Sequence, residues 1–235
     1  MTEAGVDAVP KLGQAHNALF TQVYEAIKRG ILSGRFKAGD RLLEERLAEE
    51  FGVSRNPIRE AFRLLTAEGL VEVINRRGVY IRFMDPRQSR EVVEIRAILE
   101  GHNARLVARR GDPDLLDRAA GILGQGEAAI ARGEVAALRG LNEEFHRTLA
   151  LAGENEVLQD LLGLLRLRSA LLFAKAEPEV QSESWMEHAH ILQAILAGNE
   201  EAAAGAATAH VLNAGARAER FRDAERVDVT EAPAR

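Results

Sequence analysis

Three histidines in the second half of the chain are spaced so that their side chains could meet. His146 lies one helical turn after Asn142. His188 is flanked by apolar residues at helical spacing, which indicates that it faces the interior of a bundle. The turn at Gly198-Asn199 lies midway between His188 and His210, so in an antiparallel helix pair the two imidazoles should be opposite one another. Neutral imidazoles with an amide oxygen suit a divalent ion such as zinc or nickel.

A single histidine on an apolar helix face is more often a hydrogen-bonded core residue than a metal ligand. From spacing alone, both interpretations of the three histidines stay open. The chain contains no cysteine, which excludes a thiolate metal site and a disulfide framework. His190 must point away from the interior if His188 points into it, and His102 is expected to be peripheral.

A second group of polar residues, at the start of a different helix, is suited to DNA. Arg55 and Arg59 are four residues apart and share one helix face, with Asn56 beside them. Ser54 is a favourable N-cap. The opposite face is apolar and consists of Ile58, Phe62 and Leu65. This pattern is typical of the second helix of a helix-turn-helix, whose polar face enters the major groove.

The surrounding elements complete a winged helix. Apolar residues at helical spacing predict a helix over 15–32, and a second helix over 44–51 precedes the turn at Gly52. Alternating residues predict strands over 70–75 and 79–83. Between the strands, Arg76, Arg77 and Gly78 form a wing tip that can approach a minor groove or flanking phosphates.

Asp85-Pro86 predicts the start of a new, all-helical domain, because aspartate caps a helix and proline suits its first position. Short breaks separate six helices, predicted at 86–110, 113–132, 134–152, 155–176, 180–197 and 199–222. The fold class is therefore mainly α: a winged helix-turn-helix followed by an antiparallel bundle of six to seven helices. The predicted divisions are a flexible arm (1–14), the DNA-binding domain (15–84), the helical domain (85–222) and a tail (223–235).

Charge is distributed unevenly over the 235 residues. Residues 1–85 carry 13 Lys and Arg against 12 Asp and Glu, whereas the remainder carries 18 against 24, and the whole chain has a net charge of -5. Only the first part therefore suits a polyanion. No run of 18 apolar residues and no signal-peptide core is present, which predicts a soluble cytoplasmic protein.

About 70 residues in the first part of the chain resemble the GntR-type winged-helix regulators. The resemblance is carried by Phe36 to Leu42, Leu47 to Phe62, Glu68 to Val71 and Arg77-Gly78. It implies a homodimeric transcription regulator in which Ser54, Arg55, Asn56, Arg59 and Gly78 match positions that touch the operator. One departure is Glu45, where some relatives carry an arginine that contacts a base.

Residues 86–222 resemble the FadR-like C-terminal ligand-binding domain of the same family, known as the FCD domain. Metal-containing members have histidines matching His146, His188 and His210, and an aspartate where Asn142 stands. The resemblance implies a divalent metal, most often zinc, with nickel or manganese as alternatives. Because the amide replaces a carboxylate, metal affinity should fall while more positive charge remains for a small carboxylate effector.

Arg96 and Glu100 match a further arginine and glutamate of that domain. Arg96 is a candidate effector-binding residue, although a solvent-side ion pair between the two is an equally good interpretation. The leading prediction is a ligand-responsive repressor that binds a palindromic operator as a homodimer. A metal-free pocket for an acyl or sugar-acid ligand is the alternative. A metal-dependent hydrolase is a remote one, since no H-E-x-x-H pattern is present.

Overall fold

The computed structural model describes residues 14–172 and 178–230, and the chain divides into two compact units, Met1–Phe83 and Met84–Arg235. The arm predicted over residues 1–14 lies outside the described residues except for Gln14, the first residue of a helix.

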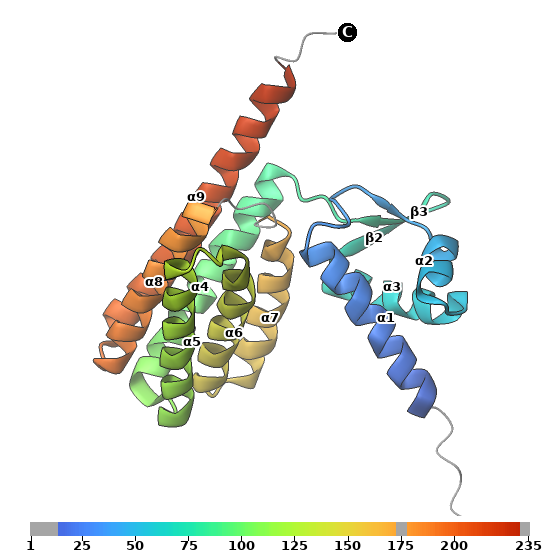
Figure 1. Cartoon of the computed structure of the whole chain (residues 1–235). Coiled ribbons are helices and arrows are strands. Elements are labelled where there is room, and N and C mark those ends of the chain that lie inside the picture. The colour runs from blue at the N-terminus through green and yellow to red at the C-terminus, as the bar shows by residue number, and fades with distance from the viewer. Residues whose placement is uncertain (1–13, 173–177, 231–235) are drawn as a thin grey trace, which may run out of the picture. The chain divides into compact units, whose positions relative to one another are not determined.

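The first unit is a winged helix (Figure 1). Its elements are α1 (Gln14–Leu32), β1 (Arg41–Leu42), α2 (Glu44–Phe51), α3 (Arg55–Glu68), β2 (Val71–Ile74) and β3 (Gly78–Ile81). The strands form an antiparallel sheet in the order β1-β3-β2, with Arg41 opposite Tyr80 and Val73 opposite Val79. The predicted hairpin is confirmed, and β1 adds a third strand that is too short to leave an alternating pattern in the sequence.

One face of α3 forms much of the core of this unit. Ile58, Phe62 and Leu65 are all buried, together with Ile27 and Ile31 of α1. Gly52, at the end of α2, has a φ of 64°, the left-handed conformation that glycine adopts at little cost. This turn lets α3 start immediately after α2, with its apolar face directed inward.

The second unit is all-helical in its described residues, as predicted. It consists of α4 (Pro86–Arg110), α5 (Pro113–Ala131), the short 3₁₀-helix η1 (Val135–Ala137), α6 (Leu138–Ala152), α7 (Glu156–Ala170), α8 (Pro178–Leu196) and α9 (Glu200–Thr230). Its main core includes Ile122 of α5, Phe145 of α6, and Trp185 and Ile191 of α8, so three helices meet there. No helix among the described residues combines the length and apolarity needed to cross a bilayer.

Small residues let α4 and α9 pack closely. A Cβ added to Gly101 of α4 would lie 2.3 Å from Thr208 Oγ1 of α9, and one added to Gly215 of α9 would lie 2.7 Å from Val93 of α4. Thr208 also donates to the carbonyl of Ala97 at 3.2 Å. Helix α9 carries His210, and α4 carries Glu100, which lies 3.8 Å from His146. The close contact of the two helices therefore fixes the relative position of these two side chains.

Three of the predicted helix boundaries in this unit were wrong. Helix α7 ends at Ala170 and is followed by a turn at 171–172, whereas a helix was predicted over 155–176. The structure begins α6 at Leu138 and places the preceding residues in η1, whereas one helix was predicted over 134–152. Helix α9 continues to Thr230, although a helix was predicted only over 199–222 and a tail over 223–235. The reason is that the segment lacks apolar periodicity but contains no glycine or proline between Gly215 and Pro233, so nothing in it interrupts a helix.

Candidate metal centre and nucleic-acid interface

The start of α3 presents its polar residues to solvent. Arg55, Asn56 and Arg59 are exposed, while the opposite side of the helix is buried. Ser54 occupies the N-cap position with extended backbone angles, but its side chain makes no capping hydrogen bond. Its exposed hydroxyl is therefore available to a partner outside the chain. The four candidate residues, Ser54, Arg55, Asn56 and Arg59, are therefore all accessible at the N-terminal end of α3.

The arginines of α3 are paired with acidic residues in the first turn of α2. Arg59 Nε donates to Glu44 Oε2 at 2.7 Å, and Arg55 Nη2 lies 2.6 Å from Glu45 Oε1. Arg55, Glu45 and Arg59 are exposed and Glu44 is 31% exposed, so solvent reaches and screens both pairs. The guanidinium groups are held close to the helix surface but can exchange these carboxylates for other acceptors.

The wing also exposes basic side chains. Arg76 and Arg77 are exposed in the turn between β2 and β3, and Arg76 has a φ of 63°. Gly78, the first residue of β3, has a φ of 110°, and an added Cβ would lie 3.3 Å from Arg41 Nε. Arg41 was not among the candidate DNA-contacting residues, and its position beside Gly78 adds a third arginine to this surface.

Three imidazoles converge inside the second unit. His146 of α6, His188 of α8 and His210 of α9 are all buried. His188 Nε2 lies 3.2 Å from Nε2 of His146 and 3.2 Å from Nε2 of His210. The predicted meeting of the three rings is therefore confirmed, and each ring directs its Nε2 atom toward the same point. Among the described residues, this is the cluster of histidine or acidic groups whose ligand atoms come close enough to hold a metal ion.

The spacing fits a divalent ion. Two imidazole nitrogens bound to tetrahedral zinc at about 2.05 Å are about 3.3 Å apart. Burial lowers the pKa of His146 well below its usual value, and the neighbouring His188 and Arg166 lower it further. Burial likewise lowers the pKa of His188, with His210 the next cause. Both rings are therefore neutral near pH 7, which leaves a lone pair available to a metal.

A buried ionic network lies behind His146. Arg166 of α7 donates to both oxygens of Glu100 at 2.7 Å and to the carbonyl of His146 at 2.8 Å. Glu100 Oε2 is 3.8 Å from His146 Nδ1. Burial would raise the pKa of Glu100, but the charge and hydrogen bonds of Arg166 and the charge of Arg96 outweigh it and lower the pKa to about 2. Glu100 is therefore a carboxylate beside His146.

Arg96 and Glu100 are both buried, so the interpretation of the two as an ion pair facing solvent is wrong. Arg96 Nε does donate to Glu100 Oε1, at 3.3 Å, but Nη1 donates to buried Ser169 Oγ at 2.9 Å. Sequence reasoning did not find Arg166, because its partners lie 20 and 66 residues away and leave no local pattern.

A second carboxylate lies behind His210. Glu187 Oε2 is 2.8 Å from His210 Nδ1, and Arg217 binds the same carboxylate. Burial would raise the pKa of Glu187, but hydrogen bonds from His210, Arg217 and Asn213 lower it to about 2. The proposed ligands His146 and His210 are thus each backed by an ionised carboxylate.

The remaining predicted residues are more accessible to solvent than the three histidines. Asn142 is on α6, one turn before His146, and is partly exposed. Its role as a fourth ligand stays a prediction. His102 and His190 are exposed, as expected.

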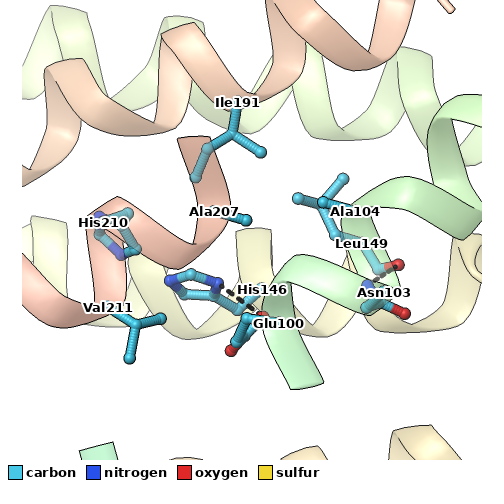
Figure 2. A pocket seen from close by; sticks show the side chains of 9 residues that line it. All are labelled: Glu100, Asn103, Ala104, His146, Leu149, Ile191, Ala207, His210 and Val211. Atoms are coloured by element: carbon cyan, nitrogen blue, oxygen red, sulfur yellow. Dashed lines mark hydrogen bonds and ion pairs between the residues drawn. The ribbon is translucent and has the colours of Figure 1, made fainter. Parts of the chain in front are cut away.

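A small cavity opens beside the imidazoles (Figure 2). It is lined by Glu100, Asn103, Ala104, His146, Leu149, Ile191, Ala207, His210 and Val211. The free space is sufficient for about one water molecule. An organic acid could therefore not enter this cavity unless the surrounding side chains or helices moved.

A winged helix with an exposed basic recognition helix, followed in the same chain by an all-helical domain with a buried site, defines a two-domain DNA-binding regulator. Residues 19–81 match the family of bacterial regulatory proteins called gntR, and residues 91–213 match the FCD domain. The chain belongs to the GntR family and carries an FCD domain. Proteins of this family are transcriptional regulators and not enzymes, so the hydrolase alternative is excluded.

Similar proteins support this assignment over most of the chain. The HTH-type transcriptional regulator YdhC of Bacillus subtilis is 33% identical over 199 residues, covering 81% of this chain and 87% of YdhC. A protein of Paenarthrobacter nicotinovorans named as the probable D-xylose utilization operon transcriptional repressor is 31% identical, covering 81% and 84%. The crystal structure of a GntR-type regulator from Rhodococcus sp. RHA1 superposes with a TM-score of 0.74 at 25% identity, covering 86% and 97%.

Proposed function

We propose that this protein is a repressor that binds a palindromic operator as a homodimer and responds to a small carboxylate bound near a divalent metal. The observation that carries the DNA-binding part is the exposure of Arg55, Asn56 and Arg59 at the start of α3, opposite a buried apolar face. Guanidinium and amide groups in this position can reach base edges in a major groove.

The other exposed groups would fix the position of the domain on the duplex. The uncapped hydroxyl of Ser54 can donate to a phosphate at the start of α3, and Arg76, Arg77 and Gly78 can approach a neighbouring groove or phosphates. Contacts of this kind contribute affinity without sequence information, whereas α3 would read the sequence.

The test of this assignment compares two arginines of the same helix. Arg59→Ala should lose selection of a duplex that the wild-type protein enriches from a random library, while circular dichroism remains unchanged. Arg63, also exposed on α3, provides the matched control Arg63→Ala. Equal loss of selectivity in both variants would contradict the assignment of Arg59 to base readout.

Four residues would hold the metal: His146, His188 and His210 through their Nε2 atoms, and Asn142 through its amide oxygen. The separation of the three nitrogens and the neutrality of two of the rings support this proposal. Zinc is the leading candidate, with nickel or manganese as alternatives. A bound divalent ion supplies positive charge and open coordination positions for an anionic ligand.

The charge around the cluster favours an anionic effector. Glu100 and Glu187 contribute two negative charges, whereas three guanidinium groups contact them. These groups belong to Arg96, Arg166 and Arg217. A divalent ion bound by neutral ligands would add two positive charges, which a carboxylate can compensate. Arg96 could contact the effector only by giving up one of its present partners, Glu100 or Ser169.

The alternative, a metal-free pocket for an acyl or sugar-acid ligand, is separated from this proposal by metal analysis of the purified protein. A thermal-shift screen of organic acids with and without chelator provides a second test. A stabilising acid whose effect disappears with chelator supports the metal-linked site. Stabilisation that is equal in both conditions supports the metal-free pocket.

An exposed apolar surface supports self-association. Ile98 of α4 and Val157 of α7 are 58% and 71% exposed, and Ile95 and Leu161 are exposed on the same two helices. In the sequence, Ile98 precedes Leu99, and Val157 and Leu161 precede Leu158 and Leu162, against which Leu99 packs. A second copy of the chain would remove this surface from water, and a two-fold dimer matches a palindromic operator.

An effector would alter DNA binding only if it favoured one arrangement of the DNA-binding domains. Residues 84–88 connect the two units and would transmit this change. Asp85 caps α4 by accepting from the backbone N–H of Gln88 at 2.8 Å, so the helix begins directly at the connection. Operator affinity that no bundle ligand changes would contradict this coupling.

A further inference from the structure

The carboxylate of Glu187 is completely occupied by side chains of one helix. Its Oε2 atom accepts from His210 Nδ1 at 2.8 Å and from Arg217 Nη2 at 2.9 Å. Its Oε1 atom accepts from Asn213 Nδ2 at 2.9 Å and from Arg217 Nη1 at 3.0 Å. Glu187 is on α8, next to His188, whereas the three donors are on α9 at spacings of three and four residues, and so share one face of that helix.

The hydrogen bond to Glu187 determines which nitrogen of His210 is available to a metal. Because a carboxylate can only accept, Nδ1 of His210 must carry the proton, and the lone pair is then on Nε2. That Nε2 atom lies 3.2 Å from Nε2 of His188, in the centre of the cluster. Turning the ring over would break the bond to Glu187 and leave a carboxylate oxygen without this donor.

We infer that Glu187 is a positioning residue for the metal centre: it fixes the tautomer and ring orientation of His210, and Arg217 and Asn213 in turn fix Glu187. Arg217 also donates to Ser184 Oγ of α8 at 2.9 Å, so it contacts α8 at two residues one turn apart. The role in metal binding rests on the metal site proposed above, whereas the effect on the imidazole can be observed without metal.

The three imidazoles differ in whether a carboxylate binds and orients the ring through its Nδ1 atom. His210 has a carboxylate at hydrogen-bond distance from Nδ1, and His146 has one at 3.8 Å. His188 Nδ1 is buried and has no hydrogen-bond partner in the described part of the chain. Since a carboxylate behind a ligating imidazole both orients the ring and increases its basicity, His210 should be the ligand that depends most on its partner.

The first experiment measures the affinity for Zn²⁺ by competition with a chromophoric chelator. Glu187→Gln keeps the shape of the side chain and should lower the affinity about 10- to 100-fold. Glu183→Gln is the matched control, because Glu183 is exposed on the same helix one turn earlier. Its affinity should stay within about two-fold of wild type. Asn213→Ala should produce a smaller loss than Glu187→Gln, because Arg217 still holds the carboxylate.

The second experiment uses the metal-free protein and ¹⁵N NMR of its imidazoles. Wild-type His210 should be in the form protonated at Nδ1, and Glu187→Gln should show a mixture of tautomers. Thermal melting in chelator shows whether each variant is folded. If Glu187→Gln melts at a lower temperature but binds Zn²⁺ as tightly as wild type, Glu187 is a structural ion pair and the inference is wrong.

Two other outcomes separate the inference from the proposal on which it rests. Wild-type protein that binds neither Zn²⁺ nor Co²⁺ would overturn the metal site, and with it the role of Glu187 in metal binding. Alternatively, the wild-type protein could bind metal although His210 is protonated at Nε2 in the metal-free state. That result would support the metal site but overturn the inference that Glu187 fixes the tautomer of His210. Tight Zn²⁺ binding that falls in Glu187→Gln but not in Glu183→Gln, together with the expected tautomer of His210, supports both.

Discussion

Arg59 donates from Nε to Glu44 Oε2 at 2.7 Å, so a residue proposed to read DNA is held by a carboxylate of the preceding helix. Binding to a duplex must replace this acceptor with a base edge or a phosphate. Glu44 therefore competes with every DNA sequence for the guanidinium group of Arg59. Only a matching operator offers acceptors that fully replace the bond to Glu44. This arrangement disfavours non-specific association more than specific association.

Replacing Glu44 should accordingly strengthen binding to DNA of random sequence. Exposed pairs of this kind contribute about 0.2–1 kcal/mol, so Glu44→Gln should tighten binding to a random duplex about 1.4- to 5-fold, as measured by fluorescence anisotropy. Glu49→Gln removes the same charge from an exposed position of α2 and controls for the overall electrostatic change. An equal gain in both variants would mean that the pairing with Arg59 has no effect of its own.

The exposed apolar surface of α4 and α7 gives a prediction about assembly. Ile98→Glu should convert a dimer into a monomer in light scattering coupled to size exclusion, because a buried unpaired carboxylate is costly. Leu196→Glu changes another apolar residue, 60% exposed at the end of α8, and should leave the mass unchanged. A monomeric wild-type protein, or an unchanged mass in Ile98→Glu, would contradict this assignment of the interface.

Two glycines of α5 should respond to alanine with opposite signs. A Cβ at Gly126 would lie 2.0 Å from the indole of Trp185, which donates to the carbonyl of Leu123 at 3.2 Å and packs edge-on against His188. Gly126→Ala should therefore destabilise the helical domain by about 1–3 kcal/mol. Gly124 has no neighbour within 4 Å of an added Cβ, so Gly124→Ala should stabilise the helix by about 0.4–1 kcal/mol. Urea unfolding followed by the emission of Trp185 measures both changes.

The lowered pKa values of His146 and His188 predict how many protons are released when a metal binds. A free imidazole is about half protonated at pH 6.5. Burial keeps both of these rings neutral at that pH in the folded chain, so neither has a proton to release when a metal binds. Calorimetry in buffers of different ionisation enthalpy should show no more than about one proton released from the three-histidine cluster at pH 6.5. A release clearly above one would show that His146 or His188 is protonated before binding.

The sequence predicted those features that depend on periodicity and on short turns. The inward face of α3 and the opposition of His188 and His210 both follow from helical spacing and from one turn near residue 198. Contacts between distant segments left no such signal. Arg166 meets Glu100 across 66 residues, and α7, on which it lies, has no pattern that marks this position.

The errors have similar causes. One of the two interpretations of Arg96 and Glu100 placed them at the surface, because charged residues four apart on a helix usually face solvent. Their burial is possible because Arg166 and Ser169 satisfy the remaining hydrogen bonds, which cannot be read from α4 alone. Strand β1 was missed because two residues cannot show alternation, and only its pairing with β3 defines it.

The single tryptophan of the chain gives the protein a built-in optical probe. The indole of Trp185 has its centroid 5.3 Å from that of His188, so a quenching ion such as Ni²⁺ or Co²⁺ seated among the imidazoles should dim its fluorescence. Duplex DNA, in contrast, would bind to a different unit of the chain. A change in tryptophan emission on adding DNA to the unlabelled protein would therefore show directly that DNA bound to the winged helix alters the environment of Trp185 in the helical domain.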